Sequence, residues 1–215
     1  MTLAGKHVIV TAGPTHEPID PVRVIANRSS GKQGFAIAGA AAKSGARVTL
    51  IAGPVCLDTP PGVTRVNVET ALQMDSAVES ALPADCAILV AAVADWRVVP
   101  APAKLKKADG PPDLQFLPNP DILAGLSASP LRPRLLIGFA AETDNVLSNA
   151  VAKRAAKGCD WIVANDVSAD KEKSVMGGDR NRVALVSADG VEDWPELSKD
   201  EVALRLIERI AAMLA

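Results

Sequence analysis

The sequence predicts an α/β fold: a doubly wound, mostly parallel, Rossmann-like sheet with helices on both faces and a flap or arm that leaves the sheet. Strand-like and helix-like segments alternate along most of the chain, which is the pattern of such a sheet. The segment 86–94 (CAILVAAVA) is apolar throughout, as expected for a parallel strand covered on both faces. Hydrophobic residues make up 48% of the 215, which is enough for the core of one large domain, 1–215.

The first elements can be placed from their composition and their boundaries. His7–Ala12 (HVIVTA) is a short β-branched run that ends in Gly-Pro, so we expect a buried strand there. Residues 34–44 are small and apolar and are followed by Gly45, which predicts a helix with a glycine after its end. The next elements are predicted in the same way: a strand at Arg47–Ala52, a helix at 70–82 with Thr70 as its N-cap, and a strand at 86–94.

The second half of the chain continues the alternation. Strands are expected at 135–141, 161–164 and 182–187, and a helix at 144–157 should end at Gly158. The last helix is the most clearly marked, because Ser198 and Glu201 form a capping-box pattern at its start. An apolar stripe at helical spacing predicts that this helix covers one face of the sheet, and it consists of Val202, Leu206, Ile207, Ile210, Met213 and Leu214.

One segment, 97–118, breaks the alternation. It is rich in Pro and Lys and has no clear hydrophobic periodicity. We expect it to form a flap or arm within the single domain rather than a second domain.

Composition and charge exclude several classes of protein. The 23 basic and 25 acidic residues give a net charge of −2, so no nucleic-acid partner is expected. No apolar run approaches the ~20 residues that span a bilayer, and the first residues do not resemble a secretory signal, so we expect no membrane partner. Three cysteines without C-x-x-C spacing argue against a disulfide framework and a zinc site, and favour a cytoplasmic location.

The rare residue types narrow the chemistry further. The chain has no tyrosine, which excludes the Tyr-x-x-x-Lys pair of short-chain dehydrogenases. Of its two histidines, His7 opens a strand and is expected to be structural. That leaves His16, and no G-x-S-x-G elbow is present to place a nucleophile beside it.

A glycine-containing loop precedes the first helix and is the first candidate for ligand binding. It reads Ser29-Ser30-Gly31-Lys32-Gln33-Gly34 and lies about one and a half dozen residues after the first strand, too far for the usual G-x-G-x-x-G turn. It is not a Walker A loop, because Ala26 occupies the first glycine position and Gln33 replaces the metal-binding Ser or Thr. Its backbone N–H groups could still hold an anion at the start of a helix. The alternative is a loop that serves only close helix–sheet packing.

The residues before this loop include three polar side chains, Asp20, Arg23 and Asn27. Arg23 could clamp a phosphate or carboxylate, and Asn27 could donate to a developing oxyanion. The alternative for each is turn or capping chemistry.

Further candidates follow the predicted strands. Asp95 comes directly after the apolar strand, in a place suited to a metal or a ligand hydroxyl, although it could instead cap a helix. Lys104, with Lys106 and Lys107, could neutralise a bound triphosphate from the arm, or could be a solvated basic patch.

Two later segments also carry polar groups. Asn119-Pro120-Asp121-Ile122 combines a turn with a helix start, with Asn119 as the expected cap; a pocket for a base is the alternative. Lys153 and Lys157 share one helix face near its C-terminal end, where cations are favoured in any case. Asn165 and Asp166 stand at another strand's end.

Together these segments resemble the phosphopantothenate–cysteine ligase family, the synthetase half of the bifunctional flavoprotein of coenzyme A biosynthesis. The resemblance extends from near the start of the chain to beyond residue 165. The matching stretches are 10–38 (VTAGPTHEPIDPVRVIANRSSGKQGFAIA), 91–97 (AAVADWR), 104–107 (KLKK), 119–124 (NPDILA), 138–143 (GFAAET), Lys153 with Lys157, and 163–167 (VANDV).

The resemblance implies a ligase that joins 4′-phosphopantothenate to L-cysteine with CTP, through an acyl-cytidylate, releasing pyrophosphate and then CMP. Asn27, Lys104 and Arg23 would serve the reaction, and Mg²⁺ would bridge the CTP phosphates through unknown protein ligands. The family is dimeric, so 97–118 is expected to reach a partner subunit. No FMN is expected, because the chain starts just before the first strand of the region that resembles the synthetase half. The implied CTP-binding residues are Ser29, Ser30, Gly31, Ala92, Asp95, Lys104, Asn119, Pro120, Asp121, Ile122, Phe139, Lys153 and Lys157.

Two other functions remain open at this point. An NAD(P)-dependent oxidoreductase could use the same sheet, but it would need a glycine turn next to the first strand and a proton donor. A non-catalytic nucleotide-binding module would explain the fold and leave the loop from Asp20 to Gly34 and the arm lysines without a role.

Overall fold

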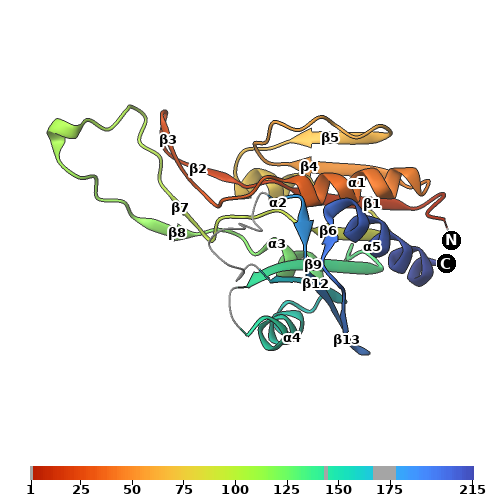
Figure 1. Cartoon of the computed structure of the whole chain (residues 1–215). Coiled ribbons are helices and arrows are strands. Elements are labelled where there is room, and N and C mark those ends of the chain that lie inside the picture. The colour runs from red at the N-terminus through yellow and green to blue at the C-terminus, as the bar shows by residue number, and fades with distance from the viewer. Residues whose placement is uncertain (1, 143–144, 167–177) are drawn as a thin grey trace.

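The computed structural model describes residues 2–142, 145–166 and 178–215, and within them an eight-stranded sheet forms the centre of the molecule (Figure 1). Six neighbouring strands are parallel, and two antiparallel strands complete one edge. In spatial order the strands are β13 (Gly190–Asp193), β12 (Val183–Ser187), β10 (Trp161–Asp166), β9 (Leu135–Glu142), β6 (Cys86–Leu89), β1 (His7–Ala12), β4 (Arg47–Ala52) and β5 (Val63–Asn67).

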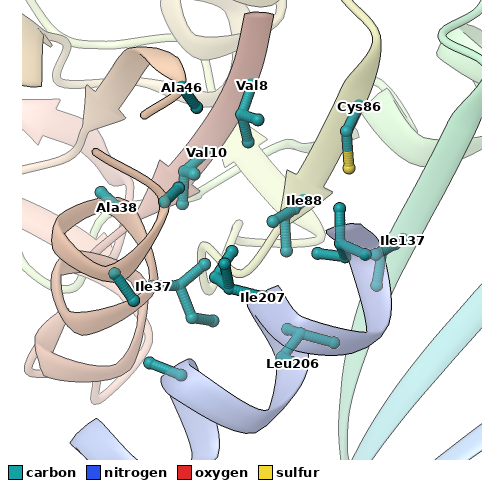
Figure 2. Close-up of a cluster of buried hydrophobic side chains, with 14 of the residues drawn as sticks. Val8, Val10, Ile37, Ala38, Ala46, Cys86, Ile88, Ile137, Leu206 and Ile207 are labelled. Carbon is teal, nitrogen blue, oxygen red and sulfur yellow. The ribbon is translucent and has the colours of Figure 1, made fainter. Parts of the chain in front are cut away.

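Helices cover both faces of this sheet, as the sequence predicted. One face packs on α1 (Lys32–Lys43) and α5 (Lys199–Leu214), and the other on α2 (Ala71–Ser80), α3 (Ile122–Ala128) and α4 (Val146–Lys157). Figure 2 shows side chains of the central strands directed at both helices of the first face. Residues in this layer include Val8, Val10, Ile88 and Ile137 from the sheet and Ile37, Leu206 and Ile207 from the helices, all 4% exposed or less.

The order of the strands creates a switch point between β1 and β6. From β1 the chain moves outward through β4 to β5, and then returns to β6 and continues outward on the other side. Ligands of doubly wound sheets bind beyond the carboxyl ends of the strands at such a point. The loops that follow β1 and β6 are therefore the first place to look for a site.

Two antiparallel ribbons project from that end of the sheet, opposite the chain termini (Figure 1). One ribbon pairs β2 (His16–Asp20) with β3 (Arg23–Ala26), and the other pairs β7 (Trp96–Val98) with β8 (Phe116–Pro118). Between β7 and β8 the chain extends outward as an arm that contains a short 3₁₀ turn, Lys107–Asp109. The excursion expected at 97–118 corresponds to most of β7, this arm and β8.

Most predicted elements are confirmed, some with shifted ends. β1 and β4 have the predicted bounds, and both the Thr70 cap of α2 and the Ser198–Glu201 capping box of α5 are present. The helix predicted at 34–44 begins at Lys32. The predicted start of the next-to-last helix, residue 144, lies outside the described residues. In the described part of the chain, no helix is long and apolar enough to cross a membrane.

Other features were not predicted from the sequence. The strand predicted at 86–94 ends at Leu89, and the chain then leaves the sheet. The segment between β1 and α1 contains the β2–β3 hairpin, and β5 lies at the edge of the sheet. Two short strands, β11 (Arg180–Asn181) and β14 (Leu197–Ser198), pair with each other immediately before α5 and set where that helix begins.

Candidate functional site

A cleft of about 790 Å³ opens at the carboxyl ends of β1, β6 and β9. It spans the sheet edge, from the starts of α1 and α5 on one face to α3 and α4 on the other. The predicted site residues that line it are Asn27, Ser29, Ser30, Gly31, Ala92, Asp95, Asn119, Pro120, Asp121, Ile122, Phe139, Lys153 and Lys157.

The glycine loop lies against the end of β1 even though 18 positions separate Gly13 from Gly31 in the sequence. The β2–β3 hairpin takes up the intervening residues, so the chain returns to the point where it left the strand. A Cβ added to Gly31 would lie 3.4 Å from the Cα of Gly13, and Gly31 has a φ of 74°. The loop thus places the first N–H groups of α1 beside the strand end, where an anion can bind.

Close packing accounts for the next glycine of the loop. A Cβ on Gly34 would lie 2.5 Å from the Cβ of Ala12, closer than any real contact. The alternative considered for these glycines, tight helix–sheet packing, therefore holds for Gly34, while Gly31 lines the cleft.

Two buried hydroxyl groups hold the wall that follows β6. The Oγ1 of Thr11 accepts the N–H groups of Val90 and Ala91, each at 3.2 Å. The Oγ1 of Thr15 accepts the N–H of Ala94 at 3.0 Å. These bonds hold the chain in place beyond the sheet. The apolar run 86–94 therefore continues after β6 has ended at Leu89.

Asn27 joins the glycine loop to this wall. Its Nδ2 donates to the carbonyl of Val93 at 3.0 Å, with a weaker contact to that of Ala92 at 3.5 Å. The side-chain amide therefore stands between the two segments that form the centre of the cleft.

The segment from Asn119 to Ile122 forms the side of the cleft near α3. The N–H of Asn119 donates to the carbonyl of Asp95 at 2.9 Å, and its Nδ2 donates to that of Ala94 at 2.8 Å. The prediction that Asn119 caps the following helix was wrong: Asp121 is the N-cap, and it accepts the N–H of Ala124 at 3.1 Å. Asn119 instead connects this segment to the wall.

Two lysines of α4 border the same side. Lys157 forms an ion pair with Asp121, and the Nζ of Lys153 donates to the carbonyl of Phe139 at 3.3 Å. Partial burial acts to raise the pKa of Asp121, but the hydrogen bond from Lys157, the N–H of Ala124 and the two lysine charges outweigh it, so the pKa lies below its usual range. Asp121 therefore stays ionised and holds Lys157 at the cleft.

The opposite side of the cleft contains further polar residues, and two of them, Asn181 and Lys199, were not among the candidates from the sequence. Gln33 donates to the carbonyl of Lys199 at 3.0 Å and accepts from the Nδ2 of Asn181 at 2.6 Å. Lys32 pairs with Asp179 at 2.7 Å. Lys32, Gln33, Asn165, Asn181 and Lys199 all line the cleft. No sequence motif marks Lys199, because its position depends on the β11–β14 pairing.

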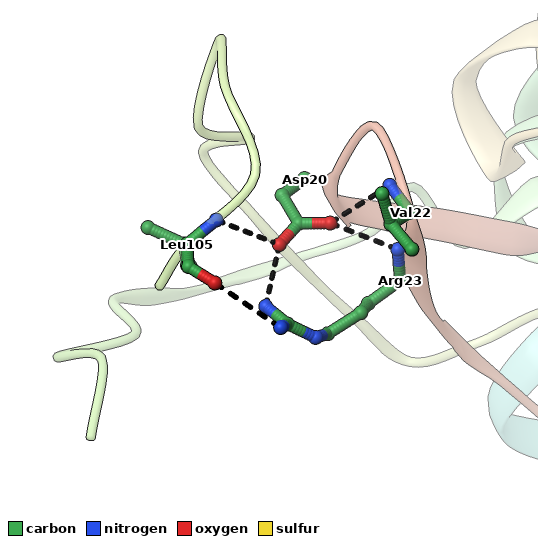
Figure 3. Close-up of polar contacts among 4 residues, drawn as sticks. All are labelled: Asp20, Val22, Arg23 and Leu105. Atoms are coloured by element: carbon green, nitrogen blue, oxygen red, sulfur yellow. Dashed lines mark hydrogen bonds and ion pairs between the residues drawn. The ribbon is translucent and has the colours of Figure 1, made fainter. Parts of the chain in front are cut away.

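Arg23 and Lys104 do not line the cleft. Arg23 lies on the β2–β3 hairpin, where its guanidinium bonds the carboxylate of Asp20 at 2.6 Å and the carbonyl of Leu105 at 3.1 Å (Figure 3). Lys104 is exposed on the arm, next to Leu105 in the chain. The structure therefore places Arg23 and Lys104 where the hairpin meets the arm, near Leu105 and apart from the other predicted site residues.

The carboxylate of Asp20 is the centre of that arrangement. It accepts the N–H groups of Val22, Arg23 and Leu105 at 2.8, 2.9 and 3.1 Å in addition to the guanidinium (Figure 3). Desolvation acts to raise its pKa, but these N–H groups and the charge of Arg23 outweigh it and hold the pKa below its usual range. Asp20 thus joins the hairpin to the arm as an ionised group.

The chain offers limited means of holding a metal ion. The described residues contain no group of three or more His, Cys, Asp and Glu side chains that could do so. Asp95 presents a carboxylate at the cleft, and within the described part of the chain no hydrogen bond to it is formed. One carboxylate suits Mg²⁺ that arrives with a nucleotide, because such ions keep several waters and bind mainly to phosphate oxygens. His16 does not line the cleft.

The comparisons with known proteins agree on one family. The model of the DNA/pantothenate metabolism flavoprotein C-terminal domain matches residues 3–214. The chain is 45% identical over 212 residues to the coenzyme A biosynthesis bifunctional protein CoaBC of Escherichia coli K12, which covers 95% of the chain and 52% of that protein. The chain therefore spans about half the length of this relative.

Solved structures share the fold. A crystal structure of the C-terminal domain of the bifunctional protein CoaBC is 40% identical, with a TM-score of 0.82, and the match covers 98% of this chain and 96% of that one. A DNA/pantothenate metabolism flavoprotein from Streptococcus pneumoniae, 23% identical, has a TM-score of 0.81 over 97% of this chain and 100% of that one, which indicates a common fold.

Proposed function

Because the chain belongs to the family of the DNA/pantothenate metabolism flavoprotein C-terminal domain, we propose that it is a CTP-dependent ligase that joins 4′-phosphopantothenate to L-cysteine. One observation carries the proposal. The family-like segments at 27–31, 91–95, 119–122 and 139, with Lys153 and Lys157, are far apart in the sequence and line one cleft. A relative whose 212 matched residues are 45% identical is named for coenzyme A biosynthesis, to which this reaction belongs.

The proposed reaction has two steps. The carboxylate of phosphopantothenate attacks the α-phosphorus of CTP, and pyrophosphate leaves. The amine of cysteine then attacks the carbonyl carbon of the acyl-cytidylate, and CMP leaves as the amide forms. Both steps develop charge on phosphate and carbonyl oxygens, so N–H donors and cations stabilise their transition states.

The contents of the cleft suit that chemistry. The N-terminus of α1 with Ser29, Ser30 and Gly31 supplies donors for phosphate oxygens, and the lysines at the two sides of the cleft supply positive charge. Asn27 stands at the centre, where its amide would hold the activated carbonyl during attack by cysteine. We assign the cytidine to Ala92, Asp95, the Asn119–Pro120–Asp121–Ile122 segment and Phe139, and further nucleotide contacts to Lys153 and Lys157.

Mg²⁺ is part of the proposal as the companion of CTP. Phosphate oxygens and water would provide most of its ligands. When bound, the ion would neutralise charge on the phosphates.

Arg23 and Lys104 enter the proposal as one unit, because Arg23 bonds Leu105, the residue that follows Lys104 on the arm. We assign Lys104 to the triphosphate and Arg23 to phosphopantothenate. For either to reach a cleft, the arm must move or must serve the cleft of a second subunit.

We also propose a homodimer formed through the two ribbons. They expose large apolar side chains: Val22 is 63% exposed, Trp96 54%, Val99 70% and Phe116 55%. A patch of this kind on a soluble protein marks an interaction surface, and a second copy of the same ribbons would cover it.

A thermal shift series tests the proposed ligand. A ligand that binds only the native state raises the melting temperature. CTP with Mg²⁺ should raise it, whereas ATP should do so less and NAD and NADP should not. A shift with NADP alone would favour the oxidoreductase. A shift with CTP but no pyrophosphate release when phosphopantothenate is added would favour a non-catalytic nucleotide-binding module.

A further inference from the structure

Lys199 is a buried cation at the side of the cleft formed by α1 and α5. The residue is only 8% exposed, yet it lines the cleft. Its backbone is fixed on both sides, since its N–H donates to the carbonyl of Asp179 at 2.9 Å and its carbonyl accepts from Gln33 at 3.0 Å. Among residues 2–142, 145–166 and 178–215, no side chain or carbonyl bonds to its ammonium group.

A second cation, Lys32, lies close enough to Lys199 to affect its charge. Burial lowers the pKa of Lys199, the nearby charge of Lys32 lowers it further, and Asp179 acts in the opposite direction. Asp179 already pairs with Lys32 at 2.7 Å. Asp179 thus faces both lysines, and the N-terminus of α1 adds its positive end beside them.

Such an arrangement is costly for folding alone. The setting of Lys199 removes part of the hydration of its ammonium group, and no hydrogen bond from the described residues replaces it, so an apolar side chain in the same place would be about as stable. The cost is offset when an anion binds, because the same low-exposure setting strengthens a charge-assisted hydrogen bond. The position thus favours a ligand with concentrated negative charge.

We propose that the ammonium group of Lys199 binds the terminal phosphates of the nucleoside triphosphate, beside the N-terminus of α1. The identity of the triphosphate rests on the proposed function. The cleft has a pair of lysines at each side, Lys153 and Lys157 from α4 and Lys32 and Lys199 from α1 and α5. A nucleotide whose base lies near Asn119–Pro120–Asp121–Ile122 would direct its phosphates across the glycine loop toward Lys199.

Lys199→Met tests this proposal, because it keeps the length of the side chain and removes only the charge. Lys43→Met is the matched control, since Lys43 is an exposed lysine at the far end of α1. Isothermal titration calorimetry in the absence of turnover would give dissociation constants for CTP, CMP, phosphopantothenate and inorganic tripolyphosphate. Lys199→Met should weaken CTP and tripolyphosphate about tenfold or more and leave CMP and phosphopantothenate within about twofold. Lys43→Met should bind all four like the wild type.

The melting temperature separates binding from a structural role. Since Lys199 is buried without a partner in the described structure, Lys199→Met should melt at the wild-type temperature or higher. A marked fall in melting temperature, with CTP and CMP weakened alike, would assign Lys199 to structure and overturn the proposal. Unchanged tripolyphosphate affinity in Lys199→Met, or a wild type that does not bind tripolyphosphate, would overturn it as well.

Because tripolyphosphate and CTP are titrated separately, the proposal for Lys199 and the proposed ligase function can fail independently. If the wild type binds tripolyphosphate but not CTP, the ligase proposal fails while Lys199→Met still decides the phosphate site. If phosphopantothenate alone is weakened, Lys199 contacts that phosphate monoester, and the assignment to the triphosphate is wrong.

Discussion

The side-chain amide of Gln33 donates a hydrogen bond of 3.0 Å to the backbone carbonyl of Lys199, 166 positions later in the chain. The Oε1 of the same amide accepts from Asn181 at 2.6 Å. Gln33 thereby joins the start of α1 to β11 and to the start of α5. Gln33 stands in the glycine loop where a Walker A motif would have a metal-binding hydroxyl. In this protein its side chain holds one side of the cleft together.

Gln33→Met should destabilise the protein. It leaves the carbonyl of Lys199 and the amide of Asn181, which is 4% exposed, without their partner. Loss of hydrogen bonds at buried groups costs about 1–3 kcal/mol, which urea denaturation can measure as a fall in the free energy of unfolding. Gln115→Met, at an exposed position of the arm, should change it little. Equal effects of the two substitutions would contradict the role given to Gln33.

Asp20→Asn should loosen the contact between the hairpin and the arm. An amide cannot offer the negative charge that now accepts the guanidinium of Arg23 together with three N–H groups. Trypsin should therefore cleave the arm faster at Lys104, Lys106 and Lys107 than in the wild type. Asp113→Asn, an exposed carboxylate on the same arm, is the control and should leave the rate unchanged.

The contact between Asp20 and the arm should weaken as the pH falls. The pKa of Asp20 is lowered on folding, so its contribution to stability is present at neutral pH and is lost as the pH falls through the folded pKa, below about 4. Hydrogen exchange of the arm amides, corrected for intrinsic rates, should accelerate over that range in the wild type. Asp20→Asn should exchange fast at every pH. Exchange in the wild type that does not respond to acid would exclude Asp20 as the group that holds the arm.

Lys104→Gln should affect catalysis and not folding. The side chain is exposed on the arm and forms no hydrogen bond or ion pair within the described residues, so the melting temperature of the ligand-free protein should stay nearly the same. Pyrophosphate release should slow sharply if the charge acts on bound CTP. Lys107→Gln serves as the control on the same arm. Release at the normal rate by Lys104→Gln would mean that Lys104 is not used in the reaction.

Asn27→Asp should separate the two half-reactions. The new carboxylate would face the carbonyls of Val93 and Ala92, which now accept from Nδ2, and would repel a substrate oxygen. We expect acyl-cytidylate formation to continue and its transfer to cysteine to fail, so the intermediate should accumulate and be detectable by mass spectrometry. A variant that makes the final product at the normal rate would refute the role of Asn27, and loss of pyrophosphate release would move that role to the first step.

The sequence was informative where local signals determine structure. β1, β4 and the capping boxes follow from apolar runs and cap residues that act within a few positions. The strand predicted at 86–94 was too long because the hydroxyls of Thr11 and Thr15 bind its later N–H groups, a contact between distant residues. The cap at Asn119 was misplaced for a similar reason, since that side chain bonds the carbonyl of Ala94.

Part of the candidate site could also be predicted from the sequence. Asp95 follows β6 and the glycine loop returns to the end of β1, and the parallel topology places those two strand ends side by side. Lys199 and Asn181 come from the antiparallel edge and the β11–β14 pairing, whose position relative to the cleft no local pattern encodes. The place of Arg23, on the hairpin and away from the cleft, likewise depends on its contact with Leu105.

An assay of the complete reaction tests the proposed ligase activity. The protein would be incubated with CTP, Mg²⁺, 4′-phosphopantothenate and L-cysteine, and CMP, pyrophosphate and phosphopantothenoylcysteine would be measured by mass spectrometry and a phosphate assay. A ligase of this kind should release one CMP and one pyrophosphate for each phosphopantothenoylcysteine, and should release pyrophosphate without that product when cysteine is left out. Absence of phosphopantothenoylcysteine from a folded protein that binds CTP would contradict the proposed ligase activity.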